Sequence, residues 1–106
     1  MGSRTYDLFA RAIHGRKQIV CTYDGYPREL CPFILGHTHG EEKALTFQFG
    51  GRGKSRLPPG GEWRCLDLSR VKDVELRDGP WRGGTSHRQA QRCVEIVDLD
   101  VNPQSP

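Results

Sequence analysis

The sequence predicts a mainly β (α+β) domain in which one short helix precedes five to six short strands. Of 106 residues, 13 are glycine and 7 are proline, and this frequency of turn residues favours short strands over a helical bundle. Several segments alternate apolar and polar residues with the period of a strand, whereas helical periodicity is confined to the N-terminal region. The length fits a single domain, residues 1–101, followed by a polar tail, residues 102–106.

The helix is expected from Tyr6 to His14. Thr5 is a suitable N-cap, Asp7 lies in the first turn, and Gly15 is a typical stop residue. Its apolar side chains recur at a spacing that places them on one face, so the helix is expected to pack against a sheet.

The strands are expected at residues 17–23, 28–35, 44–49, 63–68, 71–76 and 93–101. Asp24-Gly25 is a strong hairpin signal between the first two. Pro27 and Pro32 each remove a backbone donor, which predicts that the second strand is an edge strand or contains a bulge. In the third strand, Phe47 and Phe49 are expected to be core residues. The succession of short strands and glycine-containing corners is typical of a small, strongly bent SH3-like or Sm-like barrel.

Charge and cysteine usage favour a cytoplasmic protein without a membrane partner. The net charge is only +3, but residues 50–61 contain three cations and no acid. No apolar run is long enough to span a bilayer, and the N-terminus lacks the apolar core of a signal peptide. The cysteines are widely spaced, and we expect all four to be free, buried thiols in a reducing compartment. They are Cys21, Cys31, Cys65 and Cys93.

Two segments of the chain, LFARAIHGRKQIVCTYDG and LDLSRVKDVELRDGPW, carry a resemblance to a known family. The first resembles the start of the WYL domain, a ligand-sensing domain of bacterial transcription regulators, and the second resembles its strand, arginine corner and following strand, so that the resemblance covers residues 6–82. The matching residues are Ala12, Ile13, Arg16, Ile19, Tyr23, the segment 32–35, Leu66, Arg70, Val71 and Val74. The chain resembles a divergent, standalone member, without the usual helix-turn-helix partner.

The resemblance implies a pocket for nucleic acids or nucleotide-like ligands between the WYL-bearing strand and the basic corner. The chain has Lys43-Ala44-Leu45 in place of the Trp-Tyr-Leu triplet, so the aromatic residues of the triplet are missing, which argues against base stacking at that position. Asp67 replaces an arginine of the family, and only Leu45, Arg64 and Arg70 keep the pattern.

The residue types themselves, apart from the resemblance, also predict an anionic ligand. Guanidinium groups offer a fixed fork of donors suited to phosphate, and a glycine-rich loop brings further cations to the same region. The candidate phosphate-binding residues are Arg52, Lys54, Arg56, Arg64, Ser69 and Arg70, with Trp63 as a candidate for stacking on a base. The alternative is that the arginines form surface ion pairs with Asp67, Asp73 or Glu75, and that the loop is merely solvated.

Metal and catalytic sites are not expected. His37 and His39 alternate near Glu41 and Glu42, but no further ligand supports a metal site, and the segment reads as a hairpin turn. No cofactor motif or catalytic constellation is recognisable.

Together these observations predict a non-catalytic binding or regulatory module for a phosphate-bearing ligand, either single-stranded nucleic acid or a nucleotide. The alternative is a protein-interaction or assembly module that uses an exposed edge strand of the barrel, with the basic loop incidental. A homodimer is compatible with both, because a thin core leaves apolar surface that association can bury.

Overall fold

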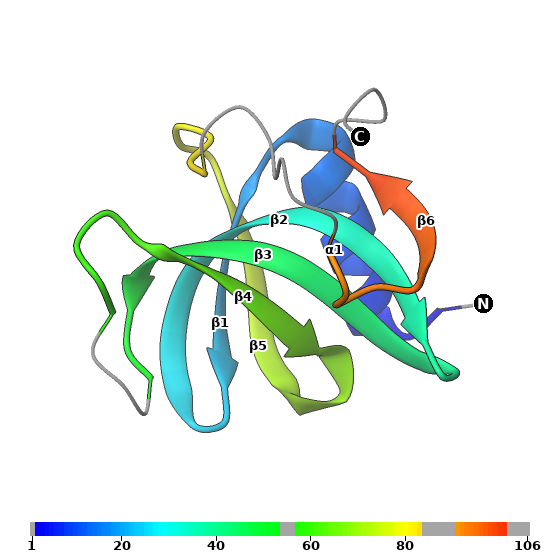
Figure 1. The fold of residues 1–106 in the computed structure, drawn as a ribbon. Coiled ribbons are helices and arrows are strands. Elements are labelled where there is room, and N and C mark those ends of the chain that lie inside the picture. The colour runs from blue at the N-terminus through cyan, green and yellow to red at the C-terminus, as the bar shows by residue number, and fades with distance from the viewer. Residues whose placement is uncertain (1, 54–56, 84–90, 102–106) are drawn as a thin grey trace.

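The computed structural model describes residues 2–53, 57–83 and 91–101. Within them the chain forms one α-helix, one short 3₁₀ helix and six antiparallel strands of a single sheet (Figure 1). The elements are α1 (Arg4–Gly15), β1 (Gln18–Tyr23), β2 (Tyr26–Thr38), β3 (Glu41–Gly51), β4 (Glu62–Asp67), η1 (Leu68–Arg70), β5 (Val71–Arg77) and β6 (Ile96–Asp100). The predicted mainly β fold, a short N-terminal helix followed by a small barrel-like sheet, is confirmed. The predicted tail, residues 102–106, lies outside the described residues.

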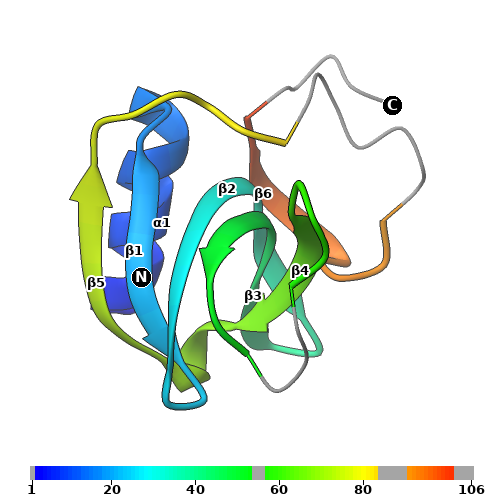
Figure 2. The same cartoon turned by 90° about the vertical axis from the view of Figure 1, so that its left-hand side faces the viewer.

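The sheet has the order β4-β3-β2-β1-β5, and β6 pairs with the second half of β2. It bends so strongly that β1 and β5 lie beside α1 while β3 and β4 lie on the other side of the molecule (Figure 2). The corner η1 connects the two ends of the strand order, from β4 to β5. The result is a barrel-like arrangement whose interior is filled by side chains.

Helix α1 begins earlier than the sequence predicts. Its N-cap is Ser3, whose hydroxyl accepts a hydrogen bond from the Tyr6 N–H at 3.1 Å, so Thr5 lies inside the first turn and the predicted Thr5 cap is wrong. The left-handed residue after the helix is Arg16, with φ 51°, rather than Gly15. The buried face of the helix packs mainly on β2 and β5.

Strand β2 is central, so the prediction that it is an edge strand is wrong. It pairs with β1 through its first half, with β6 through its second half and with β3 along nearly all of its length. The predicted bulge is present, because the register with β3 shifts between Pro32 and Ile34. A bulge accommodates a proline inside a sheet, since the missing N–H is not needed at an irregular position.

The two faces of β3 differ from the prediction. The fully buried face carries Ala44, Thr46 and Gln48, while Phe47 and Phe49 are only half-buried on the opposite face. That opposite face is covered by the chain after β5, where Trp81 packs on Phe33 with ring centroids 5.2 Å apart. The rings of Phe33, Phe47, Trp63 and Trp81 therefore form an outer aromatic cluster, which is continuous with the buried core through Phe33.

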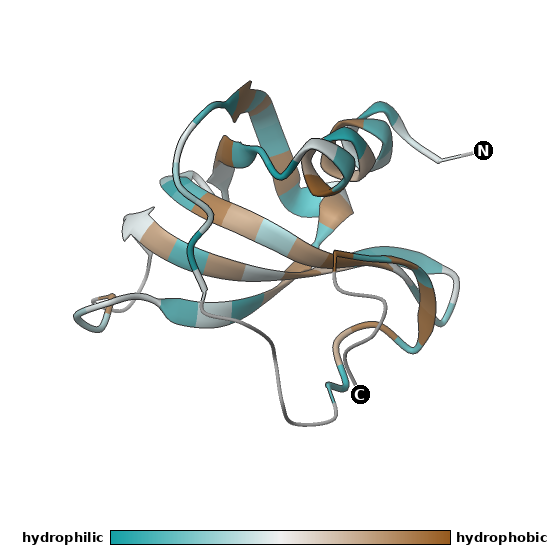
Figure 3. Ribbon diagram, turned by 90° about the horizontal axis from the view of Figure 1, so that it is seen from above, coloured by the Kyte–Doolittle hydropathy of each residue, from teal (hydrophilic) through white to brown (hydrophobic). Residues whose placement is uncertain are grey.

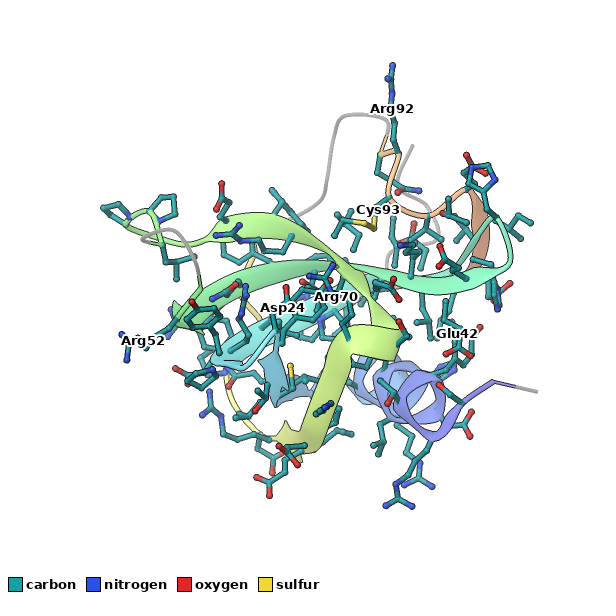
Figure 4. The ribbon with its side chains drawn as sticks, turned by 90° about the horizontal axis from the view of Figure 1, so that it is seen from below. Asp24, Glu42, Arg52, Arg70, Arg92 and Cys93 are labelled. Atoms are coloured by element: carbon teal, nitrogen blue, oxygen red, sulfur yellow. A yellow bond between two sulfur atoms is a disulfide. The ribbon has the colours of Figure 1, made fainter. Side chains whose placement is uncertain are left out.

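Cys65 and Cys93 form a disulfide with Cα atoms 5.5 Å apart, so the prediction of four free thiols is wrong for this pair (Figure 4). Cys93 was expected within the last strand, but β6 begins only at Ile96, and the preceding segment lays Cys93 against β4. Cys21 and Cys31 are free and buried, as predicted. With a disulfide present, cysteine usage no longer argues for a reducing compartment.

Candidate functional site

A cavity of about 290 Å³ opens between the β1–β2 hairpin, β4 and the η1 corner. We call it the arginine cavity, because three of its lining residues are arginines from three different elements. It is lined by Tyr23, Asp24, Arg28, Gly53, Arg64, Cys65, Leu66 and Arg70. Asp24 and Arg70 meet at one wall of the cavity (Figure 4).

Arg28 is the unusual member of the cavity, because its side chain is only 6% exposed. One terminal nitrogen donates to the Gln48 side-chain oxygen at 3.0 Å and the other to the Tyr23 carbonyl at 3.4 Å. Its Nε is buried without a hydrogen-bond partner in the described part of the chain. No carboxylate among these residues forms an ion pair with it. A buried charge normally requires such a partner, since the loss of hydration costs several kcal/mol.

The Arg28 guanidinium is nevertheless held in a fixed position. It lies over the Tyr23 ring, 5.3 Å from the centroid, and against the backbone of Gly53. A Cβ atom at position 53 would lie 3.3 Å from one of its terminal nitrogens, so the start of the glycine-rich loop covers it closely.

Burial raises the pKa of the nearby Cys21 thiol to about 11, and the Arg28 charge opposes this shift.

Arg64 and Arg70 each have a carboxylate partner. Arg64 forms an ion pair of 2.8 Å with Glu62, yet its Nε is also buried without a hydrogen-bond partner among the described residues. Arg70 binds Asp24 through two nitrogens, one of them at 2.8 Å, and lies 5.0 Å from the centroid of the Tyr23 ring. The hydrogen bond to Asp24 raises the pKa of Arg70. Ion pairing of both arginines is thus real, but with partners other than the predicted Asp67, Asp73 and Glu75.

The corner that presents Arg70 is built by Asp67. Its carboxylate accepts from the Ser69 hydroxyl at 2.8 Å and from the Ser69 N–H at 3.1 Å, and these bonds lower the pKa of Asp67. The Asp67 N–H in turn donates to the Tyr23 hydroxyl at 3.1 Å, which ties the corner to β1. Ser69 therefore shapes the corner, and its exposed side chain lies next to Arg70.

The remaining predicted site residues do not join these three arginines. Arg52 is exposed and is not among the residues that line the arginine cavity, although its backbone N–H donates to the Pro27 carbonyl at 2.7 Å. Its side chain points away from Asp24 and Arg70 (Figure 4). Lys54 and Arg56 lie outside the described residues. Trp63 points to the opposite face of β4 from Arg64 and packs on Phe33 and Phe47, with centroid distances of 4.8 and 5.3 Å.

Sequence reasoning missed Arg28 as a site residue. The available signal was its position two residues before Leu30, because residues two apart in a strand share a face and Leu30 is an obvious core residue. An arginine in phase with a buried leucine indicates a guanidinium directed into the barrel. Pro27 and the expected edge position obscured that pattern.

Metal binding by the histidine pair has no support in the described residues, which contain no group of three or more side chains suited to hold a metal ion. His37 instead pairs with Asp98 of β6 at 2.9 Å, and His39 lies 3.8 Å from Glu95.

None of the described helical segments has the length and apolar composition that crossing a bilayer requires.

Comparison of the chain with protein-family models, curated proteins and solved structures finds no match. The resemblance to the WYL domain therefore stays a prediction from the sequence.

Proposed function

We propose that the chain is a non-catalytic binding module that recognises a phosphate-bearing ligand, a nucleotide or single-stranded nucleic acid, in the arginine cavity. The observation that carries the proposal is the buried Arg28, whose charge has no carboxylate partner among the described residues and whose Nε has no acceptor there. An anionic ligand in the cavity would supply the missing counter-charge. Arg64 adds a second buried Nε beside the same cavity.

Phosphate is the anion that fits this donor set best. Guanidinium groups bind phosphate oxygens through paired hydrogen bonds, and several arginines around one cavity match a tetrahedral group with several acceptors. The volume of about 290 Å³ is at the lower end for small-molecule sites, which suits a phosphate with part of a sugar better than a whole dinucleotide. The resemblance of the corner to that of WYL domains supports the same ligand class.

Base stacking inside the cavity is not part of this proposal. The Tyr23 ring is already contacted by the guanidinium groups of Arg28 and Arg70. Trp63 belongs to the outer aromatic cluster. Recognition would therefore rest on charge and hydrogen bonding, and affinity should fall steeply as the salt concentration rises.

The test is fluorescence anisotropy with labelled nucleotides and short single-stranded RNA and DNA at low salt and across a salt series. Arg28→Met, which keeps most of the side-chain volume, is expected to weaken binding by roughly 10- to 100-fold, because a hydrogen bond to a charged group contributes about 1.5–3 kcal/mol. Arg92→Gln is the control, since Arg92 is exposed and points away from the cavity (Figure 4).

Circular dichroism of Arg28→Met would establish that the variant is folded. Equal losses in Arg28→Met and Arg92→Gln would show a diffuse charge effect and contradict the proposed site. Failure of the folded wild type to bind any probe at low salt would overturn the proposed function.

A second candidate function, association through an edge strand, is favoured by one observation on β6. Ile96 and Val97 are 62% and 47% exposed, and in the described residues β6 pairs only with β2 (Figure 3). Exposed apolar residues on an edge strand favour pairing with another chain, and antiparallel pairing of two copies of β6 would satisfy both edges symmetrically.

This candidate predicts that the protein self-associates and that Val97→Lys makes it monomeric. Lysine on an edge strand opposes pairing through its charge and its need for hydration. Sedimentation equilibrium over a concentration series measures the effect, which should change little with salt. A wild-type protein that stays monomeric at every concentration would exclude self-association through β6.

A further inference from the structure

A second concavity adjoins the arginine cavity. It has a volume of about 440 Å³ and is lined by Thr22, Asp24, Gly25, Ser69, Arg70 and Lys72. Asp24 and Arg70 line both cavities, so their ion pair forms the wall between them. The two spaces are therefore neighbouring compartments of one surface region, separated by a single pair of side chains.

The second compartment has its own donors. Thr22 and Lys72 are register partners on β1 and β5, which places their side chains side by side. Lys72 is exposed and forms no ion pair with the described carboxylates. The Thr22 hydroxyl and the Lys72 ammonium are able to donate to an anion, whereas the Ser69 hydroxyl already donates its one proton to Asp67. The lining contains no aromatic and no large aliphatic residue, so it suits an anionic group better than a base.

Arg70 is positioned to serve both compartments. Asp24 engages its Nε and one terminal nitrogen, which leaves three of the five guanidinium hydrogens for other acceptors. The same two contacts fix the plane of the guanidinium group. Asp24 thus acts as a positioning residue for Arg70, at the expense of placing a negative charge near the bound anions.

On this basis we propose that the ligand carries two phosphate groups, one bound in the arginine cavity and one bound beside Lys72, on opposite sides of Arg70. This inference rests on the proposed function, since it assigns the first phosphate to the same arginines. Two kinds of ligand carry two phosphate groups in this way: a nucleoside diphosphate, and a single nucleic-acid strand with two successive backbone phosphates.

The experiment is calorimetric titration of the wild type with a nucleoside monophosphate, a nucleoside diphosphate and a dinucleotide that carries a 5′-phosphate. Lys72→Gln is expected to weaken binding of at least one probe with two phosphates by about tenfold, as expected for loss of one charge-assisted hydrogen bond at an exposed site. It should leave the affinity for the monophosphate within about twofold. The probe that loses affinity identifies the source of the second phosphate.

Lys17→Gln is the matched control, because it removes the same charge at the opposite end of β1, where Lys17 pairs with Asp78. Equal effects of Lys72→Gln on all probes, or no effect on any, would overturn the inference. Arg28→Met distinguishes this result from failure of the proposed function, because it should weaken the binding of all three probes. If Arg28→Met weakens the binding of none of them while the wild type binds all three, the arginine cavity is not the site.

Discussion

Replacing Phe33 by alanine is expected to lower the free energy of unfolding by about 3–5 kcal/mol, the range for removing a buried aromatic side chain. Phe33 is 2% exposed and lies at the centre of the outer aromatic cluster, with its ring 4.8 Å from that of Trp63 and 5.2 Å from that of Trp81. Its carbonyl accepts a hydrogen bond from the Val101 N–H at 2.8 Å. The residue therefore links β2, β4 and the C-terminal segment.

Urea unfolding followed by tryptophan fluorescence and by circular dichroism measures this loss. Ile96→Ala is the control, because Ile96 is 62% exposed and its truncation should change stability by no more than about 0.5 kcal/mol. A loss below about 1 kcal/mol for Phe33→Ala would contradict the conclusion that the outer cluster is part of the core. Unfolding of the C-terminal segment alone would appear as a difference between the two probes.

The order of elements was predictable from the sequence because local patterns determine it. The alternation of apolar and polar residues identified the strands. The Asp24-Gly25 turn correctly separated β1 from β2, and the Ser69-Arg70 corner correctly separated β4 from β5. The central position of β2 was not predictable, because a proline argues against a central strand unless a bulge accommodates it. Likewise, the buried face of β3 was misjudged because Thr46 and Gln48 look like solvent-facing residues until their partners are known.

The site was predictable only in part, because its geometry depends on residues distant in the sequence. Arg64, Ser69 and Arg70 were identified from the corner itself. Arg64 lines the arginine cavity, Ser69 lines the second compartment and Arg70 lines both. Arg28 was missed because arginine is normally exposed, and its burial becomes visible only when Gln48 and Gly53 are placed around it. The partner of Arg70 is Asp24, 46 residues away, rather than an acid near the corner.

Removing the disulfide is expected to lower the free energy of unfolding by about 3.5 kcal/mol. Cys65 and Cys93 are 28 residues apart, and closing a loop of that length in the unfolded chain gives a stabilisation of this size in the chain-entropy model. The bond also holds the segment before β6 against β4, where Val94 is 2% exposed. Urea unfolding of Cys65→Ser/Cys93→Ser, and of the wild type with and without dithiothreitol, measures the loss. The reductant should have no effect on the double variant.

Counting reactive thiols provides an independent check of the same bond. Burial raises the pKa of Cys21 to about 11 and also raises the pKa of Cys31, so neither thiol is expected to react with iodoacetamide at pH 8 in the native protein. Mass spectrometry should therefore find no label on the native wild type, and two labels after unfolding without reductant. Mild reduction of the native protein should add label at Cys65 first, because that residue is exposed. Four labels after unfolding without reductant would show that the disulfide is absent. The loss of stability expected for Cys65→Ser/Cys93→Ser would then be contradicted as well.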